Sequence, residues 1–258
     1  MKIGIIQGRL LPPIDGFIQE FPIENWKNEF EILKTIGLNH IEFIITKKSF
    51  GNFLDLDLSK YSKYISGLCC DNLIDEKISE LDFLDLNLKP ICEIARKFEI
   101  KNINIPLLEQ SSITDNNKNQ LFSNLLSFSK IYPDLNFNFE IEDEYTTSLE
   151  LLNLSDKFYF IYDTGNLNFI GVDHYEYINK VFHKISNVHL KDRNETGSYP
   201  PGEGGVNFSL IIQTLSELNY KNIYTLQTSR RISGNEIETT ISDIKYFNRI
   251  KNENEKLF

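Results

Sequence analysis

The chain has 258 residues, of which 41% are hydrophobic and 25% are charged, and this composition is typical of a globular protein. Its net charge of −10 disfavours nucleic-acid binding as the main activity, because phosphate contacts require a basic surface. The three cysteines do not form a disulfide framework, and no apolar run has the length of a membrane span or the pattern of a signal peptide. We therefore expect a cytoplasmic protein that binds neither nucleic acid nor membranes.

Short apolar or β-branched runs alternate with longer amphipathic stretches along the whole chain. The runs predict strands at 2–7, 40–45, 63–69, 102–108, 135–142, 158–163, 185–191 and 222–227. The stretches between them predict helices at 23–36, 55–61 (a weaker pattern), 79–98, 114–131, 145–155, 171–183, 207–218 and 234–250. Eight strand–helix units of about 32 residues each favour an α/β fold in the form of a single (β/α)8 TIM barrel. We expect one domain over residues 1–258, since no linker divides the chain.

Two features of the sequence limit the alternatives. The segment "GIIQGRLLPP" after the first predicted strand lacks the G-x-G-x-x-G pattern that a dinucleotide-binding Rossmann fold requires. The chain is rich in Ile, Leu, Asn, Lys and Phe and has one alanine, Ala95, which we interpret as the result of AT-rich coding. On this interpretation the many asparagines indicate nothing about function.

Polar side chains end most of the predicted strands, and TIM barrels carry their active sites at the carboxyl ends of their strands. The clearest examples are "FYFIYD" and "NVHLKD", which are apolar until they reach Asp163 and His189. Core packing alone does not explain polar groups at nearly every strand end. In chain order these residues are Gln7, Arg9, Glu42, Cys69, Glu109, Glu140, Glu142, Asp163, His189, Lys191, Asp192 and Gln227.

The last four strands can bring a metal-binding set together. Strand alternation places Glu140 and Glu142 on one face of the fifth predicted strand. Glu140, Asp163, His189 and Gln227 can then converge from four consecutive strands. One imidazole with carboxylate and amide oxygens suits Mn²⁺, Mg²⁺, Co²⁺ or Zn²⁺.

Each of these residues also has a simpler explanation when it is taken alone. A carboxylate at a strand end is often the N-cap of the next helix, and "DTGN" fits that role for Asp163. A lone His189 is more often a hydrogen-bonded core residue than a ligand, and the adjacent Cys69 and Cys70 fit core packing. The convergence of four strand ends favours the metal site.

The Gly- and Pro-rich segment at 196–205 lies within a strand–helix unit and therefore forms a loop over the barrel mouth. Gly202, Gly204 and Gly205 give the backbone the freedom that a mobile lid needs. A rigid turn before the seventh helix, with Asn207 as N-cap, is the alternative.

The chain resembles the xylose isomerase-like TIM-barrel superfamily, in particular its sugar isomerase and epimerase members. The segments that carry the resemblance occur in family order through all eight units: "GIIQGRL", "IEFI", "FEIE", "YDTGN", "VHLKDR", "GEGGVNF" and "LQTSR". The combination of "HLKD" with the following glycine-rich loop is fairly specific, whereas each segment alone is weak.

The resemblance implies one divalent cation held by Glu140, Asp163 and His189, with Gln227 where the family usually has a glutamate. In the ketose epimerases of this family two metal-binding glutamates move the substrate proton, and an amide such as Gln227 cannot do so at neutral pH. Asn166 stands where these enzymes often have a histidine. Both departures disfavour a two-glutamate 3-epimerisation.

We therefore expect a metal-dependent isomerase or epimerase of carbohydrate metabolism that moves a proton next to a metal-polarised carbonyl. Glu140 is the expected general base, and Glu42 and Lys191 are further proton donors or acceptors. The forked donors of Arg9, Arg193 and Arg230 favour an anionic sugar substrate. The residues expected to bind the substrate are Gln7, Arg9, Asn166, Asp192, Arg193 and Arg230.

Three other functions are compatible with the fold. A polyol or inosose-type dehydratase needs the same metal and only one carboxylate base. A non-catalytic binding barrel would have lost activity through Gln227. An apurinic endonuclease of this superfamily is disfavoured, because it uses three zinc ions and the chain has only four histidines. The protein is expected to be a monomer or a homodimer.

Overall fold

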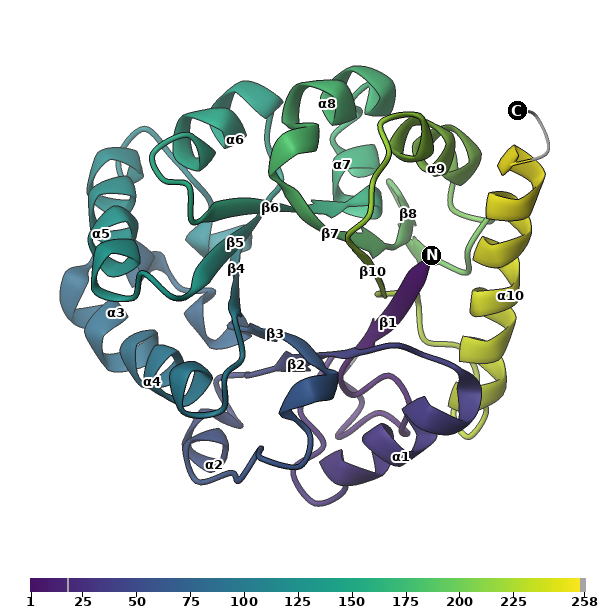
Figure 1. Ribbon diagram of the computed structural model, residues 1–258, viewed down its shortest axis with the longest axis horizontal. Helices are drawn as coiled ribbons and strands as arrows, with labels where there is room; N and C mark the ends of the chain where they lie inside the picture. The colour runs from purple at the N-terminus through teal and green to yellow at the C-terminus, as the bar shows by residue number, and fades with distance from the viewer. Residues whose placement is uncertain (18, 256–258) are drawn as a thin grey trace.

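The computed structural model describes residues 1–17 and 19–255, and its parallel strands close into a barrel inside a ring of helices (Figure 1). Strand β1 pairs with β10 on one side and with β2 on the other, and these two pairings close the sheet. The predicted TIM barrel is confirmed. The barrel strands are β1 (Lys2–Ile6), β2 (Ile41–Ile44), β3 (Ile65–Cys69), β4 (Asn102–Leu107), β5 (Asn136–Ile141), β6 (Phe158–Asp163), β7 (Ile185–Leu190) and β10 (Ile223–Leu226).

The helices lie outside the barrel and cover the outward faces of the strands (Figure 1). In the described part of the chain, none of them combines the length and the hydropathy needed to cross a membrane. The helices are α1 (Trp26–Ile36), α2 (Phe50–Leu54), α3 (Leu81–Asn87), α4 (Lys89–Lys97), α5 (Lys118–Ile131), α6 (Tyr145–Leu152), α7 (Thr164–Phe169), α8 (His174–Val181), α9 (Phe208–Glu217) and α10 (Glu236–Glu255).

Some predicted elements differ from the structure. The helix predicted at 55–61 is wrong, because "DLDLS" alternates with period two and cannot give a helical apolar stripe, and the short helix α2 precedes it. The helix predicted at 79–98 is divided into α3 and α4, and Pro90 lies in the first turn of the second. Helix α7 and the antiparallel hairpin of β8 (Asp192–Asn194) and β9 (Gly197–Tyr199) were not predicted.

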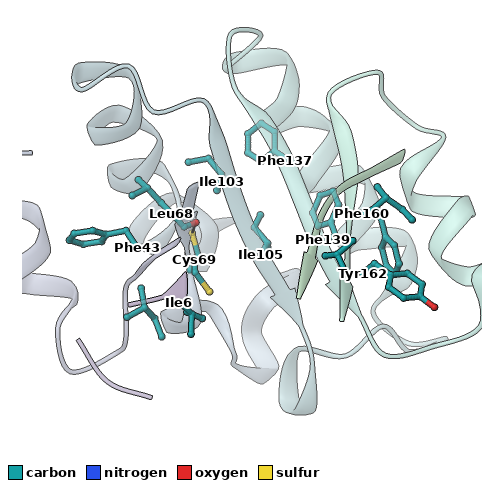
Figure 2. Packing of buried hydrophobic residues seen from close by; sticks show 14 of the residues in the cluster. Ile6, Phe43, Leu68, Cys69, Ile103, Ile105, Phe137, Phe139, Phe160 and Tyr162 are labelled. Carbon is teal, nitrogen blue, oxygen red and sulfur yellow. Dashed lines mark hydrogen bonds between the residues drawn. The ribbon is translucent and has the colours of Figure 1, made fainter. Parts of the chain in front are cut away.

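The two faces of the barrel strands have different chemistry. Phe139 and Phe158 pack edge to face at 5.0 Å between ring centroids, and Phe160 and Tyr162 at 6.2 Å, in the apolar layer between strands and helices (Figure 2). The alternate residues face the barrel interior, where TIM barrels typically carry branched apolar side chains. In this barrel the inward face is largely polar.

Buried asparagines line that interior, contrary to the interpretation of their abundance as coding bias alone. Asn104, Asn138 and Asn187 are each no more than 3% exposed. The Asn138 amide nitrogen donates to Asn104 Oδ1 at 2.8 Å. Gly67 makes room for this pair, because a Cβ there would lie 2.9 Å from Asn104 Nδ2. These amides are therefore a structural feature of the barrel core.

Candidate active site

Glu140, Asp163 and His189 come together at the carboxyl ends of β5, β6 and β7. One side-chain ligand atom from each lies within 4.8 Å of the other two, and all three residues are buried. Strand register explains the proximity. Asp163 on β6 pairs directly with His189 on β7. Glu140 on β5 pairs with Ile161, which precedes Asp163 by two residues on β6. Three of the four predicted metal ligands therefore share one site.

The atoms that this site leaves without partners fit a metal ion. Asp163 Oδ2, His189 Nδ1 and Gln227 Oε1 are buried and have no hydrogen-bond partner among the described residues. Buried polar atoms are rarely left unpaired, because their desolvation is not compensated. Two oxygens and an imidazole nitrogen without hydrogen-bond partners form the mixed N/O set that Mn²⁺, Mg²⁺, Co²⁺ or Zn²⁺ accept. The donor atoms therefore fit one divalent cation of unknown identity.

Gln227 reaches the same end of the barrel from β10. Its backbone nitrogen donates to Leu190 O at 3.1 Å. This bond continues the pairing of β10 with β7, in which Thr225 lies opposite His189. Its side-chain nitrogen faces Gln19 Oε1 at 3.4 Å. The nitrogen is thus directed at the loop after β1, and the carbonyl oxygen is the atom that remains for a ligand.

Asp163 serves as a helix cap and keeps one oxygen free. Its Oδ1 accepts a hydrogen bond from the Asn166 backbone nitrogen at 2.7 Å and caps α7, whereas Oδ2 lies 3.9 Å from Lys191 Nζ. Burial raises the pKa of Asp163 to about 6, although the charge of Lys191 opposes the shift. The two roles proposed for this residue, cap and ligand, use different oxygens and are compatible.

Glu42 lies against the Nε2 side of the His189 ring. Its Oε2 accepts from His189 Nε2 at 2.9 Å, and both side chains are fully buried. Burial raises the pKa of the Glu42 carboxyl, but the neighbouring His189 outweighs this effect and the net pKa is lowered. Burial lowers the pKa of His189, but the carboxylates of Glu42 and Glu140 raise it well above its usual range. This placement makes Glu42 a partner of the histidine, and its predicted role in proton transfer stays a prediction.

Asn166 connects the acidic and basic residues of the site. Its amide nitrogen donates to Glu140 Oε1 at 2.9 Å. Its amide oxygen accepts from Lys191 Nζ at 2.9 Å and from Arg193 Nη1 at 2.8 Å. The side chain therefore orients the expected base and holds two cations at the barrel mouth.

Arg193 and Glu142 form the outer side of this group. The Arg193 guanidinium lies over the Phe169 ring, 3.8 Å from its centroid, and its Nη1 is 3.4 Å from Glu142 Oε2. Burial raises the pKa of Glu142, while Arg193 and Lys191 oppose the shift. Glu142 is thus paired with arginine, and Glu140 is the glutamate of β5 that lies in the ligand cluster.

The other predicted substrate-binding residues bond mainly to the loop after β1 and to neighbouring backbone. Gln7 is fully buried, and its Oε1 accepts from Ile44 N at 3.2 Å. Arg9 donates to Thr228 O at 3.0 Å, and burial together with the charge of Arg230 lowers its pKa to about 10. Arg230 donates to the carbonyl oxygens of Leu11 and Gly8.

Asp192 anchors the glycine-rich loop. Its Oδ2 accepts from the backbone nitrogens of Gly202 at 2.7 Å and Gly204 at 3.0 Å, and its Oδ1 accepts from Val206 at 3.0 Å. Both oxygens of this predicted substrate-binding residue are thereby engaged by the protein. The N-cap role predicted for Asn207 is confirmed, since its side chain accepts from the Leu210 backbone nitrogen.

The sequence-based prediction did not identify several residues of the site. Asn187 lies two residues before His189 on the inward face of β7, so strand alternation could have identified it. Gln19 and Glu29 reach the mouth from the loop after β1 and from α1. No periodic pattern marks Gln19, and Glu29 looks like any acidic residue in a first helical turn.

Comparison with known proteins agrees with the fold. Residues 134–250 match the model of the family described as xylose isomerase-like TIM barrel. An inosose dehydratase of Clostridium botulinum (strain Alaska E43 / Type E3) is 29% identical, and the match covers 38% of this chain and 40% of that protein. The matched region thus spans about two fifths of the length of that relative.

Solved structures match over nearly the whole chain. An L-ribulose 3-epimerase superposes with a TM-score of 0.74 at 14% identity, covering 98% of this chain and 95% of the other. The IOLI protein with a bound zinc atom gives a TM-score of 0.71 at 15% identity and covers 98% of both chains. At these identities the likeness shows the fold. The predicted resemblance of the chain to the xylose isomerase-like TIM-barrel superfamily is confirmed.

Proposed function

We propose that the protein is a divalent-metal-dependent enzyme that removes a proton next to the carbonyl of a keto-polyol or keto-sugar and then eliminates water. The observation that carries the proposal is the cluster of Glu140, Asp163 and His189, in which Asp163 Oδ2 and His189 Nδ1 have no hydrogen-bond partner among the described residues. A bound divalent ion would polarise the substrate carbonyl and so acidify the neighbouring C–H group.

The protein supplies the groups that move protons. Glu140 is the base, because it lies in the ligand cluster and the hydrogen bond from Asn166 to its Oε1 fixes the orientation of the carboxylate. Lys191 is the acid, with its ammonium group 2.9 Å from Asn166 Oδ1 and the side chain 18% exposed. Glu140 takes the proton from the carbon beside the carbonyl. Lys191 protonates the hydroxyl on the next carbon, which leaves as water while a C=C bond forms.

Gln227 favours dehydration over a two-base epimerisation. An amide neither accepts nor returns a proton at neutral pH, so position 227 cannot supply the second glutamate base of such an epimerisation. A one-base dehydration does not need the second carboxylate. The C. botulinum relative named inosose dehydratase supports the same choice of reaction class.

A neutral polyol fits the mouth better than the anionic sugar expected from the sequence. Arg9 and Arg230 donate to backbone carbonyls of nearby loops, and Arg193 donates to Asn166 and Glu142. Each guanidinium therefore already serves a structural contact.

Epimerisation or isomerisation is the second candidate, and the position of Lys191 supports it. Its Nζ lies 3.9 Å from Asp163 Oδ2, close enough to the ligand set to return a proton to the same carbon. A solved structure of the same fold is that of an L-ribulose 3-epimerase.

Incubation of the purified protein with an inosose and with ketohexoses in deuterated water, with Mn²⁺, Mg²⁺, Co²⁺ or Zn²⁺ added, tests both candidates. Loss of water from the inosose supports dehydration, and deuterium incorporation without water loss supports epimerisation. Glu140→Gln should abolish either reaction, whereas Glu142→Gln, the same substitution just past the end of β5, should retain most of it. If no substrate loses water or exchanges a proton with any of the metals, the proposal is wrong.

A further inference from the structure

A chain of hydrogen bonds crosses the barrel interior beneath the ligand cluster. His40 Nε2 lies 3.1 Å from Thr225 Oγ1, and the Thr225 hydroxyl donates to Asn187 Oδ1 at 3.0 Å. Asn187 Nδ2 then donates to Glu42 Oε2 at 2.8 Å, and the same oxygen accepts from His189 Nε2 at 2.9 Å. All five side chains are at least nine-tenths buried.

The carboxylate at the end of this chain fixes the direction of every bond in it. An ionised Glu42 only accepts, so Asn187 must present its nitrogen to Glu42 and its oxygen to Thr225. Thr225 uses its single hydrogen on Asn187 and therefore accepts from His40. His40 accordingly carries its hydrogen on Nε2, and it is neutral because burial lowers its pKa to about 4.

The backbone of β1 is shaped to hold the first member of the chain. A Cβ on Gly4 would lie 2.2 Å from His40 Cδ2, so the imidazole packs directly on the glycine. No other residue type fits at position 4 without moving that ring. The hydrogen-bonded side chains thus come from His40, just before β2, and from β2, β7 and β10, and only their far end touches the ligand cluster.

We propose that His40, Thr225 and Asn187 are positioning residues that hold Glu42 in place, so that Glu42 fixes His189 with its Nδ1 toward the metal ion. The inference rests on the metal centre of the proposed function. With Nε2–H committed to Glu42, Nδ1 is the ring nitrogen that remains to bind an ion in place of a proton. It lies 3.4 Å from Glu140 Oε2 within the cluster. Groups that orient a ligating histidine commonly change metal affinity by about 10–100-fold.

The metal affinity of Thr225 variants tests whether this chain of hydrogen bonds positions His189. Thr225→Val keeps the shape and removes the hydroxyl, and it should weaken Zn²⁺ or Mn²⁺ binding by about tenfold in competition with a chelator. Thr225→Ser restores the hydroxyl and should bind within about twofold of the wild type, since its bonds to His40 and Asn187 are retained.

Thr214→Val is the matched control. Thr214 is equally buried but donates to Leu210 O within its own helix, so the change should leave metal affinity unaltered. Unchanged affinity in Thr225→Val, failure of Thr225→Ser to rescue it, or an equal loss in Thr214→Val would each overturn the proposal.

A measurement on the metal-free protein separates this inference from the proposed function. The His189 Nε2 proton, buried and bonded to Glu42, should give a slowly exchanging downfield NMR signal, shifted in Thr225→Val and unchanged in Thr214→Val. If the wild type binds no divalent ion, the proposed function fails, and this NMR signal alone then tests whether the hydrogen-bond chain positions His189. An unshifted signal in Thr225→Val contradicts the chain even when the metal binds.

Discussion

The side chain of Gln227 has one nitrogen and one oxygen, and only the oxygen is left for a ligand. The nitrogen faces Gln19 from the loop after β1, and the oxygen is buried without a partner among the described residues. A glutamate at this position would offer the same oxygen with a negative charge. As a metal ligand, Gln227 would therefore supply this oxygen and lower the charge of the set by one.

Gln227→Glu should strengthen binding of a divalent ion at least tenfold, because affinity for such ions rises with the number of charged ligands. Competition titration with a chelator at neutral pH measures the change. Gln120→Glu, the same substitution on an exposed position of α5, is the control and should leave the affinity unchanged. Equal affinities of Gln227→Glu and the wild type would show that residue 227 is not a ligand.

At the scale of elements, the loops at the barrel mouth are held by single carboxylates. Asp192 accepts three backbone hydrogen bonds from the loop before α9. Glu29, on α1, accepts from Gly8 N at 2.8 Å and from Leu10 N at 3.2 Å in the loop after β1. Removing the acceptor oxygens of either residue should therefore affect a whole loop.

Asp192→Asn should cost about 2–3 kcal/mol of unfolding free energy, because an amide nitrogen would replace the oxygen that accepts from Gly202 and Gly204. Urea unfolding measures this cost, and hydrogen exchange should become faster over residues 200–206. Asp173→Asn makes the same change at the N-cap of α8, where asparagine caps equally well, and should cost little. Similar costs for both variants would contradict the anchoring role.

Glu29 should make the stability of the fold depend on pH. Burial raises its pKa to about 7, although the hydrogen bonds from Gly8 and Leu10 oppose the shift. Between about pH 4.5 and 7 the folded state therefore holds a proton that the unfolded state has released. The stabilisation that this proton gives the folded state is complete below about pH 4.5. It is lost as the pH rises from there through 7, by up to about 1.4 kcal/mol per pH unit.

Urea unfolding of the wild type and of Glu29→Gln at pH 5, 6, 7 and 8 measures this contribution. The variant should lose less stability than the wild type as the pH rises, because a glutamine at 29 has no charge to bury. Glu31→Gln, an exposed change on the same helix, should follow the wild type. Parallel pH profiles of the wild type and Glu29→Gln would exclude Glu29 as the titrating group.

At the scale of the whole molecule, the proposed metal centre and its partner Glu42 join strands that are far apart along the chain. Glu140, Asp163 and His189 lie on three adjacent strands, and Glu42 bonds to His189 across 147 positions of sequence. An ion that binds only the folded barrel stabilises all of these contacts together. Its effect on thermal unfolding should therefore be global.

A divalent ion at 100 times its Kd should raise the unfolding free energy by about 2.7 kcal/mol. For a chain of this size the increase corresponds to roughly 5–10 °C in Tm. Calorimetry across a series of ion concentrations measures the shift, and Asp163→Asn should abolish it. A Tm of the wild type that is independent of all four ions would contradict a metal site in this barrel.

The sequence alone determined the barrel and the positions of its polar strand ends. All eight barrel strands were predicted to within two residues at either end, because strand length and period-two alternation are local properties of the chain. The same alternation placed Glu140, Asp163 and His189 on inward positions at neighbouring strand ends. The helix predicted at 55–61 failed where the same period-two pattern occurred outside a strand.

Only the tertiary structure decided which atoms of those residues are free. Asn166 takes one oxygen of Glu140, Glu42 takes one nitrogen of His189, and Gln19 lies opposite the nitrogen of Gln227. These partners are 26, 147 and 208 positions away along the chain, so no local pattern records them. A ligand site depends on lone pairs that remain after every other hydrogen bond is made, and that balance exists only once the barrel is closed.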